Sequence, residues 1–184
     1  MTQLDQITAD QFQKMCDILP ADRQEKMHRL RTDNRKKQSA VAYLLLVHAL
    51  RHARLMFDLP KLTGEGKPVI VGREDIHFSL SHCPVGAAAV VSDVPVGVDI
   101  EVIRPYNPKV ARFVCSDAEI EEIELSEDPA FAFTTAWTKK ESCIKLYGGS
   151  IGPGMKELST CFDRLEFETK IGDGWVVTAC CEKY

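Results

Sequence analysis

The chain has 184 residues, of which 45% are hydrophobic and 27% charged, a composition typical of a globular protein with a substantial core. Its formal net charge of −4 argues against a nucleic acid or an anionic membrane surface as its partner. The most apolar segment, residues 40–50, is too short to span a bilayer. The seven cysteines are odd in number, include no CxxC pair and follow no secretory leader, so we expect reduced thiols in a cytoplasmic protein.

The pattern of apolar and turn-forming residues predicts an α+β protein. Residues 34–58 are expected to form one long helix, with Asp33 as its N-cap and Pro60 beyond its end. The basic residues of the preceding stretch, 23–37, form either a solvated helix face or an anion site. A Gly/Pro turn within 62–70 leads to strands at 76–80 and 87–91, which the segment "SHCPVG" joins as a hairpin.

The second part of the chain repeats this order loosely. A strand at 95–102 is followed by helices at 107–124 and 130–147, the loop "GGSIGPG" and two further strands. The seam lies near residues 93–96, which suggests a duplicated α+β unit with halves 1–94 and 95–184.

Two acidic side chains stand out in the strand "PVGVDIEV". Asp99 and Glu101 are two residues apart and therefore point to the same face of that strand. They either share one site or repel each other on one surface.

A second cluster lies in "AWTKKESCIKLYGG". Helical spacing places Trp137, Glu141 and Lys145 on one stripe, with Lys140 beside them. Alone, this pattern is typical of an exposed Glu141–Lys145 ion pair and a packed tryptophan. Together with "GVDIE", however, the chain offers three carboxylates, which suit Mg²⁺, and lysines that suit a phosphate.

A third group comes from the N-terminal part. Lys67 stands between Gly66 and Pro68, which restrict its backbone. Ser81 and His82 close a predicted strand beside a turn, where a hydroxyl and an imidazole can meet an anion, although a lone histidine is more often structural.

Four of these segments, "GKP" (66–68), "FSLSH" (78–82), "GVDIE" (97–101) and "WTKKESCIK" (137–145), occur in the order and approximate spacing of the Sfp-type 4′-phosphopantetheinyl transferases, and the chain resembles that family over about residues 30–150. The resemblance implies a pseudo-dimer of two similar α+β halves. It also implies Mg²⁺-dependent transfer of 4′-phosphopantetheine from coenzyme A to a serine of an apo acyl or peptidyl carrier protein, releasing 3′,5′-ADP. Mn²⁺ is the alternative ion.

The resemblance also implies residue roles. The metal ligands would be Asp99, Glu101 and Glu141, with Lys145 near the reacting phosphate. The coenzyme A contacts would come from a set of basic and polar side chains: Arg31, Lys36, Lys67, Ser81, His82 and Lys140. The N-terminal half would contribute mainly to coenzyme A binding, and the C-terminal half would carry the metal and catalytic residues.

Glu119 has two expected roles. In "FVCSDAEI" it aligns approximately with a family glutamate that helps to deprotonate the serine. The same letters form a capping box, in which Ser116 is the N-cap and Glu119 lies three residues later. The two roles are not exclusive, and both stay open at this point.

Two other functions use similar parts. A metal-dependent nuclease also needs clustered acids and a lysine, but this chain lacks a basic stripe with interleaved aromatic residues. A coenzyme A or carrier-protein binding module without catalysis is the other alternative. The expected partners are coenzyme A and a carrier protein, without nucleic acid or membrane, and two halves in one chain favour a monomer.

Overall fold

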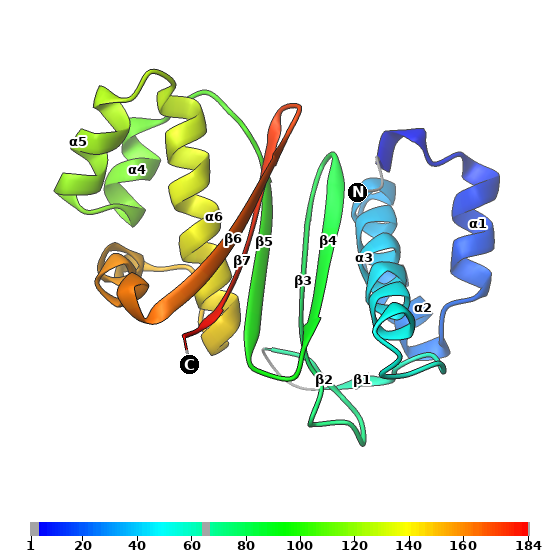
Figure 1. Cartoon of the computed structure of the whole chain (residues 1–184). Helices are drawn as coiled ribbons and strands as arrows, with labels where there is room; N and C mark the ends of the chain where they lie inside the picture. Colours follow the sequence, from blue (N-terminus) through cyan, green and yellow to red (C-terminus); the bar gives the residue numbers. More distant parts are fainter. Residues whose placement is uncertain (1–3, 64–66, 184) are drawn as a thin grey trace. The chain divides into compact units, whose positions relative to one another are not determined.

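The computed structural model describes residues 4–63 and 67–183, and the prediction of an α+β fold is confirmed (Figure 1). The chain divides into two compact units, Met1–Val94 and Pro95–Tyr184. Within the described ranges, no helix is both long enough and apolar enough to cross a membrane.

The first unit contains a helical N-terminal part and two small antiparallel ladders. Its helical elements are η1 (Leu4–Gln6), α1 (Ala9–Asp17), α2 (Ala21–His28) and α3 (Asp33–His52). Its strands are β1 (Leu62–Thr63), β2 (Val69–Ile70), β3 (His77–Cys83) and β4 (Gly86–Ser92), paired β1–β2 and β3–β4. The turn expected within 62–70 includes residues 64–66, which lie outside the described residues.

Helix α3 is shorter than predicted and begins with a different cap. The N-cap is Thr32, whose hydroxyl accepts a hydrogen bond from the Arg35 amide, whereas Asp33 is the first helical residue. The helix ends at His52 and not near residue 58, because Arg54 adopts a left-handed conformation (φ 57°). The Leu55 amide then donates back to the Leu50 carbonyl, a common way to close a helix before any proline.

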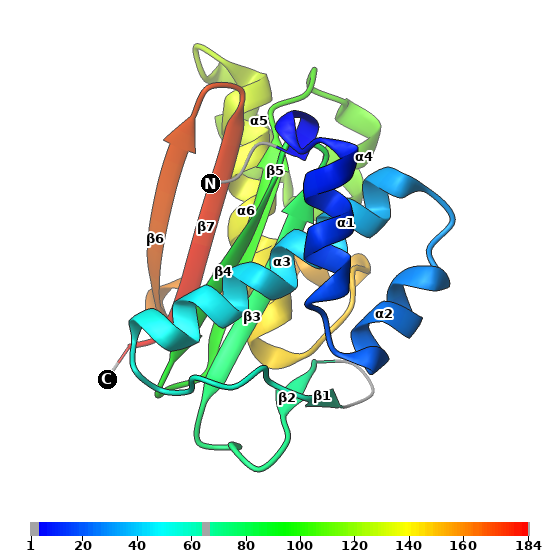
Figure 2. The same ribbon diagram turned by 90° about the vertical axis from the view of Figure 1, so that its right-hand side faces the viewer.

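Helix α3 covers the β3–β4 hairpin, and the two views agree on this arrangement (Figures 1 and 2). Leu46 and Leu50 on its buried face pack with Ile70, Ile76 and Phe78. The predicted hairpin is confirmed, but only Pro84 and Val85 connect its strands, since residues 81–83 belong to β3.

The second unit packs helices against a three-stranded antiparallel sheet of order β5-β7-β6. Its strands are β5 (Val96–Val102), β6 (Leu165–Gly172) and β7 (Trp175–Glu182). Its helical elements are α4 (Pro108–Val114), α5 (Asp117–Leu125), α6 (Pro129–Tyr147) and the 3₁₀ stretch η2 (Pro153–Arg164). The strand at 95–102 and the helix at 130–147 are thus confirmed within a residue or so.

The single helix predicted at 107–124 is wrong. Two helices occupy this region, because Cys115 has an extended backbone (φ −108°, ψ 149°) and the next residue starts a new helix. Ser116 caps that helix: its hydroxyl accepts from the Glu119 amide, while the Glu119 carboxylate accepts from the Ser116 amide. Asn107 caps α4 through the Lys109 amide, which donates to its side-chain oxygen.

Helix α6 lies directly on β5 because Gly97 has no side chain. A Cβ atom at Gly97 would overlap the carbonyl oxygen of Ser142 and approach the Leu146 amide nitrogen to 2.7 Å. Farther along the same interface, the hydroxyl oxygen of Thr178 lies 2.9 Å from that of Thr138 and 3.1 Å from that of Thr169. The helix and the sheet are therefore joined by close backbone approach and by satisfied buried hydroxyls.

Candidate functional site

The centre of the candidate site is an ion pair between β5 and α6. The Lys145 ammonium donates to Asp99 Oδ1 at 2.6 Å, with 4% of the Asp99 side chain and 28% of the Lys145 side chain exposed. An exposed Glu141–Lys145 pair was the alternative interpretation of the helix, but the bond that forms is to the strand. The pair joins residues 46 apart in the sequence, so it depends on the close packing of α6 on β5.

Glu101 and Glu141 add negative charge near this ion pair, and their pKa values are raised as a result. Burial, repulsion from Asp99 and repulsion from Glu101 raise the pKa of Glu141 to about 7, opposed by Lys145. Burial and Asp99 also raise the pKa of Glu101, whereas Arg104 and Lys145 act to lower it. The three carboxylates therefore interact electrostatically, as expected from residues that share one site rather than three.

The donor chemistry of this group suits a hard cation. All three side chains offer carboxylate oxygens, and the buried Glu141 Oε1 has no hydrogen-bond partner within the described part of the chain. In their present positions, no three His, Cys, Asp or Glu side chains of the described residues converge as a metal-binding group. Among the residues that the structure describes, Lys145 is the one cation that acts on both glutamates, and it is bonded to Asp99.

A pocket of about 320 Å³ opens beside Glu101 within the second unit. Phe133 and Trp137, with ring centroids 6.0 Å apart, form part of its wall, and Arg104 contributes a cation. Trp137 therefore both packs on the core around Val114 and faces a hollow. Arg104 and Phe133 were not predicted from the sequence as site residues. The available signals were that Arg104 comes just after the acidic strand and that Phe133 lies four residues before Trp137 on the same helix.

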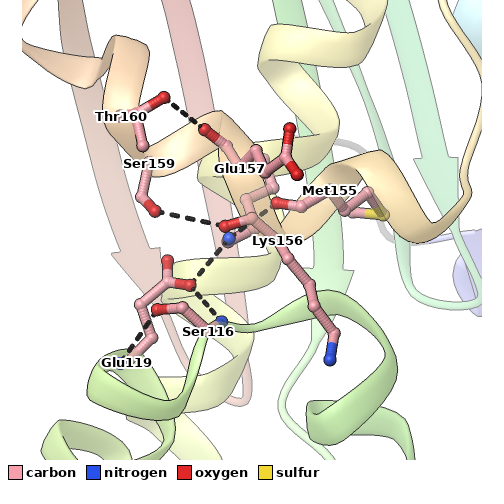
Figure 3. A network of polar contacts seen from close by, with 8 residues as sticks. Ser116, Glu119, Met155, Lys156, Glu157, Ser159 and Thr160 are labelled. Carbon is pink, nitrogen blue, oxygen red and sulfur yellow. Dashed lines mark hydrogen bonds and ion pairs between the residues drawn. The ribbon is translucent and has the colours of Figure 1, made fainter.

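Glu119 and Lys140 form a second polar group in this unit. The buried Lys140 ammonium donates to Glu119 Oε2 and to the Met155 carbonyl, both at 2.8 Å. Glu119 Oε2 also accepts from the Ser116 amide at 2.8 Å (Figure 3). The capping role predicted for Glu119 is thus confirmed. The Lys140 ammonium is bonded to Glu119 and Met155, and not to the acidic residues around Lys145.

The remaining candidate residues lie in the first unit. Arg31 is exposed before α3, and Lys36 in its first turn makes an ion pair with Asp33 at 3.2 Å. On β3, Ser81 is buried, whereas His82 is exposed and pairs in register with Ala87. Lys67 is half-buried in a bend before β2.

The basic stretch 23–37 is not one solvated helix face, because it spans α2 and the start of α3. Arg23 is buried with its guanidinium 5.0 Å from the Tyr43 ring centroid, and the Lys37 ammonium donates to the Ile7 carbonyl. These two charges serve the fold. Lys26, Arg31 and Arg35 remain exposed, so they are the basic side chains of this stretch that are best placed for a solvent anion.

With this geometry in place, comparison with known proteins shows what the chain is similar to. Residues 95–178 match the 4′-phosphopantetheinyl transferase superfamily, a range that contains the acidic strand, α6 and the greater part of the sheet. Over this range the chain is similar to this superfamily, and Sfp-type transferases are among the proteins that it resembles.

Individual relatives match over part of their length. The chain is 32% identical over 115 residues to the 4′-phosphopantetheinyl transferase psf-1 of Bacillus pumilus, covering 61% of this chain and 48% of that protein. It is 39% identical over 105 residues to the 4′-phosphopantetheinyl transferase AcpT of Salmonella typhimurium, covering 53% and 55%. It is 31% identical over 85 residues to Sfp of Bacillus subtilis, covering 45% and 38%. The chain thus spans about half the length of these relatives.

Proposed function

We propose that this protein transfers the 4′-phosphopantetheine group of coenzyme A to a serine of an apo acyl or peptidyl carrier protein and releases 3′,5′-ADP. The observation that carries the proposal is the cluster of Asp99, Glu101 and Glu141 around Lys145, within a segment that matches the transferase superfamily.

The proposed reaction is a substitution at the β-phosphorus of coenzyme A. The serine oxygen forms a bond to this phosphorus, the bond to the 3′,5′-ADP oxygen breaks, and the serine proton leaves to a base. Negative charge grows on the leaving group and on the phosphoryl oxygens, so positioning and positive charge do most of the catalytic work. The protein needs no nucleophile of its own.

The metal ligands in this proposal are Asp99, Glu101 and Glu141, with Mg²⁺ as the working ion and Mn²⁺ as the alternative. A bound divalent ion would offset most of the charge of the three carboxylates and stabilise charge on the pyrophosphate. The carboxylate donors and the unbonded buried oxygen of Glu141 support this assignment.

Lys145 is the proposed contact to the reacting phosphate. It already balances Asp99, and its partial exposure leaves its ammonium within reach of a ligand. Coenzyme A binding is assigned further to Arg31, Lys36, Lys67, Ser81 and His82 of the N-terminal half. Lys140 is withdrawn from this group, because its ammonium is fully buried and bonded within the protein.

The cell compartment and the assembly state belong to the same proposal. All seven cysteines are present as thiols, which supports the cytoplasm as the compartment. We propose that the protein acts as a monomer on a carrier protein, without nucleic acid or membrane as a partner.

The test is an intact-mass spectrum of an apo carrier protein after incubation with this protein, coenzyme A and Mg²⁺. The expected result is the gain of one phosphopantetheine, which disappears when EDTA is added and returns with excess Mg²⁺. Several unrelated carriers are needed, because the carrier is not identified. If coenzyme A binds but none of them is modified, the chain is a binding module; if a nucleic acid is cut instead, it is a nuclease.

A further inference from the structure

We propose that Glu119 and Lys140 form a structural ion pair that positions α6, and that Glu119 is therefore the counter-ion of Lys140 rather than the base that deprotonates the carrier serine. The kinetic part of this inference rests on the proposed transferase function, whereas the structural part stands on the geometry alone.

The pair ties three segments of the second unit together. Lys140 lies on α6, Glu119 in the first turn of α5, and Met155 in η2. One buried ammonium donates to the Glu119 carboxylate and to the Met155 carbonyl, each at 2.8 Å. Ser116, Glu119 and Met155 lie around this junction in Figure 3. A single side chain thus fixes where α5 begins and where η2 crosses α6.

One oxygen of the Glu119 carboxylate is occupied by donors within the protein. Its Oε2 atom accepts from two donors at once, the Ser116 amide and the Lys140 ammonium, both at 2.8 Å. A proton delivered to this oxygen would compete with both donors. A general base needs instead an oxygen that is within hydrogen-bond reach of the proton that it abstracts.

Because Lys140 is fully buried, its charge depends on Glu119 for balance. Its side chain is 0% exposed, against 17% for Glu119, so only Glu119 can exchange its partner for water. The neighbouring Cys115 thiol is also fully buried, and burial together with Glu119 raises its pKa to about 11. An ammonium left without its counter-ion in such surroundings is strongly destabilising.

The pair has a direct consequence for the candidate site. Lys140 immediately precedes Glu141 on α6, and the next turn carries Lys145. Holding Lys140 against α5 and η2 sets the rotation of α6 about its axis. That rotation presents Glu141 and Lys145 to the acidic strand β5. Glu119 and Lys140 therefore act through other residues, as positioning residues.

A double-mutant cycle separates this role from base catalysis. The variants are Glu119→Gln, Lys140→Met and the two combined, with Glu122→Gln as the matched control, because Glu122 is an exposed acid on the same helix. The Glu119→Gln variant keeps the bond to the Ser116 amide, since glutamine suits the third position of a capping box. For each variant, the midpoint of thermal unfolding and the initial rate of phosphopantetheine transfer are measured, the latter well below that midpoint.

We expect Glu119→Gln to lower the midpoint by about 10 °C, because it leaves a buried ammonium without its counter-ion. Lys140→Met should lower it by less, since water can reach Glu119. The combined variant should recover to within about 3 °C of the unchanged protein, and its transfer rate to within about 5-fold. Glu122→Gln should change neither quantity.

The opposite result is equally clear. A general base contributes about 100-fold or more, so a combined variant that regains its midpoint but stays at least 100-fold slow would overturn the inference. If the unchanged protein transfers nothing, the proposed function fails, and the unfolding midpoints alone decide. In that case additive losses in the combined variant refute the ion pair, and compensation supports it.

Discussion

Two lysines five residues apart on α6 make contrasting ion pairs. Lys140 is fully buried, with one carboxylate and one carbonyl as partners, so its charge is balanced inside the protein. Lys145 is 28% exposed and is bonded to Asp99, while Glu101 and Glu141 add negative charge that it does not balance. The enclosed pair can only hold structure together. The partly open and acid-rich group still favours an added cation and remains accessible to a ligand.

The largest expected effect comes from removing an acid on the Lys145 side. Asp99→Ala or Glu141→Ala should reduce transfer by about 10³-fold, since a bound metal supplies several kcal/mol of transition-state stabilisation. Circular dichroism should still show a folded protein, and carrier modification is followed by intact mass. Full activity of either variant in Mg²⁺ would refute the metal assignment.

Gly97→Ala should disrupt the close packing of α6 on β5. The Lys145–Asp99 pair depends on this packing, whereas the Lys140–Glu119 pair does not. The added methyl group would overlap the Ser142 carbonyl oxygen and push α6 away from β5. We expect a loss of about 3 kcal/mol in the free energy of unfolding, together with slower transfer. Chemical denaturation measures the first effect. Gly154→Ala is the control, because a Cβ atom there meets nothing within 4 Å, and an equal loss in both variants would argue against the close approach.

Lys145→Met should slow transfer by about 100-fold and also lower stability, because Asp99 would lose a partner for its buried carboxylate. The stability loss should be smaller than that of Glu119→Gln, since Lys145 is partly exposed and the carboxylates around it can take up a cation. Thermal unfolding with and without Mg²⁺ tests this difference. A larger loss than in Glu119→Gln would reverse the proposed ranking of the two pairs.

The smallest effect is a gain. Because burial and repulsion raise the pKa of Glu141 from its ordinary value of 4.5 to about 7, stability is lost as the pH rises between these two values, and the whole cost is present above pH 7. Glu141→Gln should therefore raise the midpoint of unfolding by a few degrees at pH 8 in EDTA. This gain should shrink as the pH falls and vanish near pH 4, where Glu141 is protonated in both the folded and the unfolded protein. An equal gain at both pH values would show that charge repulsion is not its source.

Local patterns in the sequence predicted much of this molecule. Valine and isoleucine residues indicated β5, and helical spacing indicated α6. The capping box at Ser116 was predictable as well, yet the helix before it was extended through Cys115. The end of α3 was misplaced because nothing in the letters near Arg54 requires its left-handed backbone.

The arrangement of charges was harder to predict than the elements. Spacing placed Lys140 beside Glu141 and Lys145, and it could not show that Lys140 turns instead toward α5 and η2. That outcome depends on Met155 and Glu119, which are 15 and 21 residues away. The partner of Lys145 was equally remote, so local rules favoured Glu141, one turn earlier, over Asp99.

The order of the strands in the second sheet also bears on how this protein is made. The acidic strand β5 pairs with β7 and not with its neighbour in sequence, so Val96 lies opposite Cys181. Such a long-range pairing is slow to form, and during translation it cannot be completed until residue 181 has left the ribosome. Until then β5 carries Asp99 and Glu101 without the strand that fixes them. The acidic group is consequently among the last parts of the molecule to become functional.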